Sequence, residues 1–228
     1  MNSFDKTYII IPVFNEEKVI RKTISELKKY FNNIIVINDG STDSTNIELD
    51  KLKIITINHP INLGQGASIK TGIEFVLNYT NAEAVITFDA DGQHSVEDAK
   101  IFAKKIFETE KKIIFGSRFL KNENNIPFLK KIILKIAIYL TNLLFRVKLT
   151  DTHNGLKAFK IEALREIEIN IEGYAFETEI IIDVSKKNIS YMELPTNIIY
   201  TEYSKAKGQS VLNSIRIFED IMIRLFKK

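Results

Sequence analysis

Short, continuous apolar segments alternate along the chain with segments whose apolar residues recur every three or four positions. The continuous segments are rich in β-branched residues and predict buried strands of a parallel sheet. The periodic segments predict amphipathic helices that cover such a sheet. The predicted strands span residues 8–13, 34–38, 53–58, 84–88 and 112–116. The predicted helices span residues 17–30, 44–49, 67–79 and 95–110, the last with a capping-box pattern in which Asp98 answers Ser95.

The repeated order of strand, helix and strand implies an α/β fold, in which a mostly parallel central sheet carries helices on both faces. Such sheets bind ligands beyond the carboxyl ends of their strands. The residues that follow the predicted strands are therefore the first candidates for a site. They are mostly acidic, with one arginine: Glu16, Asp39, Asp89, Asp91 and Arg118.

The pattern changes after Arg118. A long apolar helix is predicted first, then a polar turn that leads into a strand, a second helix, an edge strand that contains Pro195 and a last amphipathic helix. These segments span residues 126–146, 151–159, 174–187, 191–201 and 210–227.

Asp89 and Asp91 lie two positions apart, directly after a predicted strand. An extended chain places two such side chains on the same side. Two carboxylates can hold one hard divalent cation, and Gln93 can add a third oxygen, with phosphates and water completing the coordination. The alternative is an acidic turn after a strand, where Asp is common.

Two further segments at strand ends are compatible with nucleotide binding. Asp39 could accept hydrogen bonds from a base or ribose, although a turn in which Ser41 or Thr42 caps the next helix explains the same segment. Pro12 marks the end or an irregularity of the first strand. Phe14 could stack on a nucleobase and Glu16 could bind the edge of the base; the alternative places Phe14 in the core.

Arg118 follows the fifth predicted strand, where a guanidinium could clamp a phosphate through two hydrogen bonds. The alternative is a surface arginine.

The three histidines lack the spacing of metal ligands, so a zinc site is not expected. The chain has no cysteine, which excludes disulfides and thiolate metal sites, and its net charge of +3 is too small to indicate nucleic-acid binding.

Several segments, taken in order, resemble glycosyltransferase family 2 with the GT-A fold, and within it the dolichyl-phosphate mannosyltransferase-like, polyprenyl-phosphate branch. The resemblance covers about residues 7–160. It rests on IPVFNEE (11–17), NDGSTD (38–43), NLGQG (62–66), DADGQH (89–94), GSR (116–118) and DTHNGLKAF (151–159).

The resemblance implies an inverting, metal-dependent transfer of a sugar from a UDP- or GDP-sugar. It implies one GT-A domain over residues 1–228, with a nucleotide-sugar-binding half (1–120) and an acceptor-binding half (121–228). Pro12, Phe14, Glu16 and Asp39 would line the nucleotide pocket, and Arg118 would contact phosphate. Mg²⁺ or Mn²⁺, together with the donor diphosphate, would be bound by Asp89, Asp91 and Gln93.

The acceptor stays open between a polyprenyl phosphate and a glycan hydroxyl in surface-polysaccharide synthesis. A lipid phosphate is already ionised near neutral pH, whereas a hydroxyl requires a general base. The candidate bases are Asp151, Glu177 and Glu179. A non-catalytic nucleotide-binding module of the same fold is the alternative from another class.

The predicted helix at 126–146 indicates where in the cell the protein acts. Lys131, Lys135, Asn142 and Arg146 form a narrow polar stripe on an otherwise apolar helix, which suits a position in a membrane interface. Packing against the core or a partner subunit is the alternative. No apolar stretch is long enough to predict a transmembrane helix, so we expect a cytoplasmic protein, peripheral on the cytoplasmic face of the membrane. The basic segment 205–208 and the tail 224–228 could support the same surface or bind phosphates.

Overall fold

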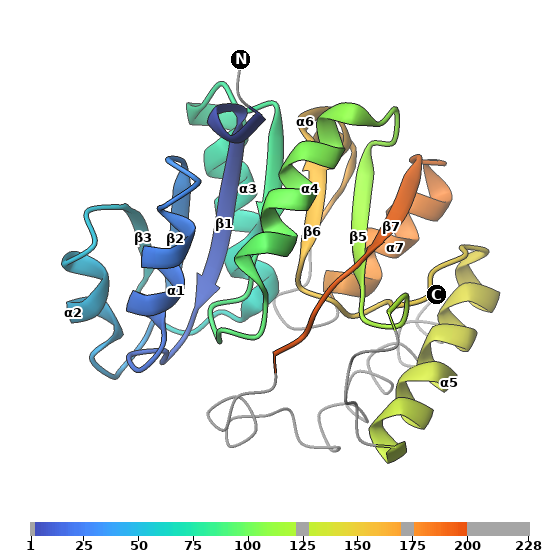
Figure 1. Cartoon of the computed structure of the whole chain (residues 1–228), viewed down its shortest axis with the longest axis horizontal. Coiled ribbons are helices and arrows are strands. Elements are labelled where there is room, and N and C mark those ends of the chain that lie inside the picture. Colours follow the sequence, from blue (N-terminus) through green and yellow to red (C-terminus); the bar gives the residue numbers. More distant parts are fainter. Residues whose placement is uncertain (1–2, 122–127, 170–175, 200–228) are drawn as a thin grey trace.

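The structure is a computed structural model that describes residues 3–121, 128–169 and 176–199. One seven-stranded sheet lies at its centre, in the order β3-β2-β1-β4-β6-β5-β7 (Figure 1). The strands are β1 (Thr7–Val13), β2 (Ile34–Asp39), β3 (Ile55–His59), β4 (Ala84–Thr87), β5 (Ile113–Ser117), β6 (Lys157–Lys160) and β7 (Tyr191–Pro195).

The five strands expected in the first half of the chain are confirmed, and they run in one direction. The later strand β6 is inserted between β4 and β5 and pairs antiparallel with both. Its first residue, Lys157, therefore lies at the edge where β4 and β5 end. The polar turn before β6 is delivered to the carboxyl edge of the parallel strands, the lower edge of the sheet in Figure 1.

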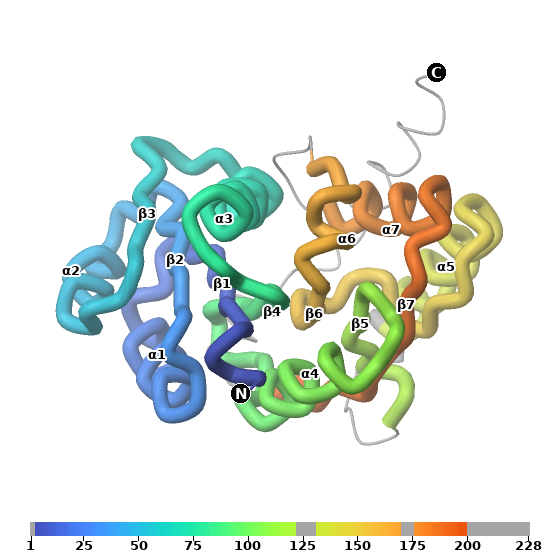
Figure 2. The backbone as a smooth tube through the Cα atoms, turned by 90° about the horizontal axis from the view of Figure 1, so that it is seen from above, coloured from blue at the N-terminus to red at the C-terminus, as the bar shows by residue number. Residues whose placement is uncertain are grey.

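Helices cover both faces of the sheet, as the sequence predicted (Figure 2). The helices α1, α2 and α4 bury their apolar residues on one face, and α3, α6 and α7 bury theirs on the other. A short 3-10 helix, η1 (Ser3–Lys6), precedes β1. The helices are α1 (Ile20–Leu27), α2 (Thr45–Asp50), α3 (Gln65–Tyr79), α4 (Val96–Glu108), α5 (Phe128–Phe145), α6 (Ile161–Glu166) and α7 (Phe176–Lys186).

The segment after β1 forms a turn instead of the first turn of a helix. Asn15 has a φ of 53°, and the Glu16 N–H donates to the Thr45 hydroxyl (2.8 Å). The helix predicted from residue 17 therefore begins only at Ile20. The turn is held against the loop after β2.

One predicted helix cap is wrong, and a second is confirmed only in part. Ser41 does not cap α2, because its hydroxyl accepts the Asn15 N–H (3.0 Å), while Thr42 donates its own N–H to the Asn15 side chain (2.8 Å). Ser95 does cap α4, accepting the Glu97 N–H (3.2 Å), but Asp98 does not complete a capping box. Its carboxylate instead accepts the N–H of Asn197 (2.7 Å), a residue 99 positions away that no local pattern could indicate.

The strand β7 lies at the edge of the sheet, as Pro195 predicted, and it ends at that proline. The predicted helix at 210–227, the basic segment 205–208 and the tail 224–228 lie outside the described residues. Within the described part of the chain, no helix is both long and apolar enough to cross a membrane.

Candidate active site

Loops of the described residues meet at the carboxyl edge of the sheet, including the loop after β3, whose Leu63 and Gly64 N–H groups donate to Asp39. The others follow β1, β2, β4 and β5 and precede β6. The segment after β7 joins them, because Ile199 donates its N–H to the Gln93 carbonyl (2.9 Å) and Ile198 pairs with His94 in an isolated bridge. The acidic residues predicted from the strand ends and Arg118 therefore lie on loops at the same edge.

Asp89 is held from three sides. Its Oδ1 accepts from the Gln65 side chain (3.0 Å), and its Oδ2 contacts the His94 Nε2 (3.0 Å). Gly155 lies against the same carboxyl group, and a Cβ at that position would overlap it. Asp89 keeps 30% of its side chain exposed, so it is fixed in place and still reachable from solvent.

The electrostatic surroundings keep Asp89 charged. Burial acts to raise its pKa, but the neighbouring His94 and the positive charges of Lys157 and Arg118 together hold the pKa below its usual value. Asp91 behaves differently. Burial, and then the charge of Asp89, raise the pKa of Asp91 to about 6. The two carboxylates therefore leave a local excess of negative charge.

A divalent cation fits this pair chemically. Carboxylate oxygens are the donors that Mg²⁺ and Mn²⁺ prefer, and a bound cation would relieve the repulsion that raises the pKa of Asp91. No three acidic or histidine side chains of the described residues gather closely enough to hold a metal without other ligands.

Gln93 contacts Asp91 as a donor. Its backbone N–H reaches Asp91 Oδ1 (3.0 Å), and its side-chain amide reaches Oδ2 (2.7 Å). The structure therefore brings Gln93 to the acidic pair, as expected. Its role as a third metal ligand stays a prediction.

Asp39 is buried beneath the loop after β3. Its carboxylate accepts the N–H groups of Leu63 (2.9 Å) and Gly64 (2.8 Å) and contacts the His59 Nδ1 (2.7 Å). These contacts fix the loop that leads into α3. Whether Asp39 also binds a base or ribose stays a prediction.

Phe14 is not a core residue. It lies on the turn after β1 with 40% of its surface exposed, where an aromatic ring can stack on a planar ligand. Pro12 is half-buried near the end of β1, and Glu16 is buried on the same turn and close enough to Asp91 to influence its pKa. The residues predicted to line a nucleotide pocket therefore include one, Glu16, that lies close to Asp91.

Arg118 is not a loose surface arginine. Its backbone N–H (3.1 Å) and its Nε–H (2.6 Å) both donate to Asp151 Oδ2, and its Nη2 donates to the carbonyl oxygen of His153. The turn before β6 thus binds Arg118 on one side and packs Gly155 against Asp89 on the other.

The two glutamates predicted as alternative bases are both buried in the first turn of α7. Glu177 forms an ion pair with the buried Lys157, the first residue of β6, and Lys157 also donates to the carbonyl oxygen of Asn154. Burial raises the pKa of Glu177, and Lys157 opposes the rise. Glu179 is 9% exposed.

Comparison with known sequences decides the family. The family model described as Glycosyl transferase family 2 matches residues 8–168. The chain belongs to glycosyl transferase family 2. This confirms the resemblance that the sequence motifs indicated.

Named relatives agree with the branch that the motifs indicated. A UDP-N-acetylglucosamine–dolichyl-phosphate N-acetylglucosaminyltransferase of Methanococcus voltae is 32% identical, over 95% of this chain and 94% of that protein. The dolichyl-phosphate beta-glucosyltransferase ALG5A of Trichomonas vaginalis is 28% identical, over 87% of this chain and 67% of that protein.

A solved structure shares the fold. Glucosyl-3-phosphoglycerate synthase from Mycobacterium tuberculosis, in complex with Mn²⁺, uridine diphosphate and phosphoglyceric acid, superposes with a TM-score of 0.71 over 96% of this chain and 78% of that chain. Its sequence is 16% identical, so the likeness supports the GT-A-like fold alone.

The sequence did not indicate several residues of this glycosyltransferase site. The spacing of the histidines predicts no zinc site and gives His94 no other role, yet His94 contacts Asp89. The sequence patterns give no role to Gln65, which donates to Asp89, and place Lys157 only in a predicted strand. A polar residue inside an otherwise apolar strand was the only local signal for Lys157, and nothing local identified its partner Glu177.

Proposed function

We propose that this glycosyltransferase moves a sugar from a UDP- or GDP-sugar to a polyprenyl phosphate, with Mg²⁺ or Mn²⁺ at Asp89 and Asp91. The observation that carries the proposal is the pair of fixed carboxylates with Arg118 at the same sheet edge. The names of two relatives, which both specify dolichyl phosphate, support the acceptor. The binding halves 1–120 and 121–228 belong to the same proposal.

The donor would lie across the carboxyl edge of β1, β2 and β4. Phe14 would stack on the base, with Pro12, Glu16 and Asp39 around it. Asp89, Asp91 and Gln93 would hold the divalent ion, which would neutralise charge on the diphosphate leaving group. Arg118 would contact a phosphate oxygen, where negative charge increases as the sugar–phosphate bond breaks.

The state of the candidate bases supports a phosphate acceptor. A hydroxyl acceptor needs a carboxylate that can reach its proton. Asp151 already accepts three N–H groups, Glu177 is paired with Lys157 in the protein interior, and Glu179 is only 9% exposed. A lipid phosphate needs no base, because it is an anion near neutral pH. These contacts favour the lipid phosphate over a glycan hydroxyl.

A surface on α5 supports a membrane location. Four exposed apolar residues recur along the helix at spacings of four, three and four positions and so lie on one face. They are Ile132, Ile136, Tyr139 and Leu143.

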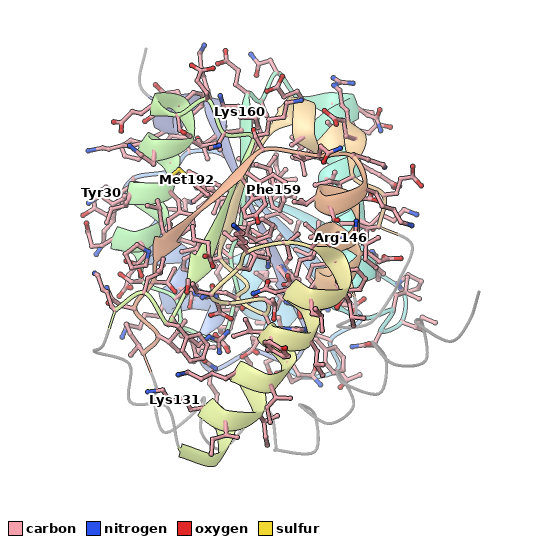
Figure 3. The ribbon with its side chains drawn as sticks, turned by 90° about the vertical axis from the view of Figure 1, so that its right-hand side faces the viewer. Tyr30, Lys131, Arg146, Phe159, Lys160 and Met192 are labelled. Atoms are coloured by element: carbon pink, nitrogen blue, oxygen red, sulfur yellow. The ribbon has the colours of Figure 1, made fainter. Side chains whose placement is uncertain are left out.

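Two exposed lysines, Lys131 and Lys135, lie beside this apolar row, and Figure 3 shows Lys131 toward the outer end of α5. The predicted polar stripe is shorter than expected, because the Asn142 side chain donates to the Leu149 carbonyl (2.8 Å) and accepts its N–H (3.0 Å). An apolar row beside lysines suits a bilayer with anionic lipids. We propose peripheral binding there, on the cytoplasmic face.

A transfer assay tests the acceptor and the metal together. The protein is incubated with radiolabelled UDP- or GDP-sugars and a polyprenyl phosphate, with Mn²⁺ or with EDTA. We expect a labelled lipid that forms only with the metal. Label that appears only on an oligosaccharide acceptor, in a reaction that needs Asp151, Glu177 or Glu179 as base, would overturn the lipid-phosphate proposal.

A sedimentation assay tests the membrane surface. Leu143→Glu in α5 should abolish binding to vesicles that contain anionic phospholipid. Ile101→Glu, at an exposed apolar position on α4, is the matched control and should bind like the wild type. Equal binding by both variants would contradict the role of α5.

A further inference from the structure

The turn before β6, residues 150–156, brings Asp151 to Arg118 and leaves Asp151 few ways to act as a base; this turn is called the corner below. We propose that Asp151 is a positioning residue, which fixes the guanidinium of Arg118 against the donor diphosphate instead of accepting a proton from the acceptor. The inference rests on the proposed function, which assigns Arg118 to the donor phosphates.

The carboxylate of Asp151 accepts three N–H groups of its own surroundings. Oδ2 accepts the backbone N–H and the Nε–H of Arg118, and Oδ1 accepts the His153 N–H (3.3 Å). The Asp151 side chain is only 1% exposed. A general base must come within hydrogen-bond distance of the proton that it removes. A buried carboxylate with three N–H donors is badly placed for that task and well placed to hold a cation.

The contacts also set the orientation of Arg118. Guanidinium is planar and carries five N–H donors in a rigid arrangement. Nε is fixed by Asp151 and Nη2 by the carbonyl oxygen of His153, so two donors of one plane are bound by a single turn. Fixing the plane in advance lowers the ordering cost when a phosphate binds.

The corner itself is tied to two strands. On β7, Glu193 Oε1 accepts the N–H (2.8 Å) and hydroxyl (2.9 Å) of Thr150 and the N–H of Asp151 (3.2 Å). On β5, the Ser117 hydroxyl lies 2.6 Å from the Thr150 hydroxyl. The side chain that orients Arg118 is therefore held by the rigid sheet.

A kinetic double-mutant cycle tests the inference. It compares wild type, Asp151→Asn, Arg118→Gln and the double variant, using the nucleotide-sugar donor and Mn²⁺. Loss of the charged hydrogen bond should lower kcat/KM of Asp151→Asn about 10- to 100-fold, mainly through KM for the donor, with the pH profile unchanged in shape. The double variant should be no worse than Arg118→Gln alone. Additive losses, or loss of the acidic limb of the pH profile in Asp151→Asn, would overturn the inference.

An NMR measurement separates this inference from the proposed function, because it needs no substrate. The Arg118 Nε–H signal, assigned by its disappearance in Arg118→Gln, should be protected from hydrogen exchange in the wild type and lose protection in Asp151→Asn. Asp183→Asn is the control, since Asp183 is also paired with a cation, Lys187 (3.2 Å), but on α7; it should change nothing at Arg118. An unprotected Arg118 signal in the wild type contradicts the inference. A protected signal in a protein that transfers no sugar would refute the proposed function alone.

Discussion

The α-carbon of Gly155 lies against the carboxyl group of Asp89, at a place where the smallest side chain would overlap it. The Gly155 carbonyl also accepts the hydroxyl of Thr87 (2.6 Å), at the end of the strand that leads to Asp89. The turn before β6 and the loop after β4 are therefore fitted to each other.

Gly155→Ala should displace Asp89 and weaken metal binding. We expect the apparent Mn²⁺ affinity to fall about 10- to 100-fold, which is the range for residues that support metal ligands. Titration with Mn²⁺ measures the affinity, and circular dichroism verifies that the variant is folded. A folded variant with wild-type affinity would show that the contact does not control Asp89.

His94 should act on the metal through Asp89. His94→Ala removes the contact to Asp89 Oδ2, whereas His94→Gln can still offer a side-chain N–H to that oxygen. We expect the Mn²⁺ concentration needed for half-maximal activity to rise about tenfold in His94→Ala and by less in His94→Gln. Identical metal requirements in the wild type and His94→Ala would contradict this role.

The buried pair of Lys157 and Glu177 should matter for stability. Lys157→Met leaves the Glu177 carboxylate buried without its partner and should cost about 3–5 kcal/mol of unfolding free energy. Replacing both residues, in Lys157→Met with Glu177→Leu, should recover much of that loss. Urea unfolding measures both variants, and a double variant as unstable as Lys157→Met would contradict the explanation.

His153 should make the fold sensitive to acid. Burial lowers the pKa of His153 from 6.5 to about 4. Between these two pH values the His153 side chain is therefore neutral in the folded protein but protonated in the unfolded chain. This contribution to stability is complete above pH 6.5 and is lost as the pH falls toward 4. Between pH 7 and pH 5 the loss is about 2 kcal/mol.

His153→Gln removes the titrating group, so its unfolding free energy should fall by about 2 kcal/mol less than that of the wild type over the same pH range. Urea unfolding at pH 7 and pH 5 gives the difference. An equal change in unfolding free energy between pH 7 and pH 5 for the two proteins would show that His153 is not held neutral in the folded state.

The sequence predicted the sheet and the residues at its edge because both depend on local patterns. Apolar runs of the length of a strand identified β1, β2, β4 and β5, and the residues directly after those runs included Asp89, Asp91 and Arg118. Because parallel strands end at the same edge of the sheet, these residues can be predicted to lie at one edge even when no side-chain contact is known.

The remainder of the site depends on partners far apart in the sequence. Arg118 meets Asp151 across 33 positions, and Asp98 meets Asn197 across 99. The antiparallel direction of β6 brings Asp151 to Arg118, and the pairing of β7 with β5 brings Asn197 toward Asp98. A strand of four residues such as β6 carries no signal for its direction. The contacts on which the proposed role of Asp151 rests are therefore found only in the structure, because the sequence is equally compatible with a general base at this position.

One binding measurement tests the central claim most directly. Isothermal titration with UDP and with GDP is performed with and without Mn²⁺, on the wild type and on Asp89→Asn with Asp91→Asn. We expect one of the nucleotides to bind the wild type only with Mn²⁺. The double variant should bind it at least about 100-fold more weakly, since charged interactions are lost at both carboxylates. Equal binding by the wild type and the double variant, with or without Mn²⁺, would contradict the central claim.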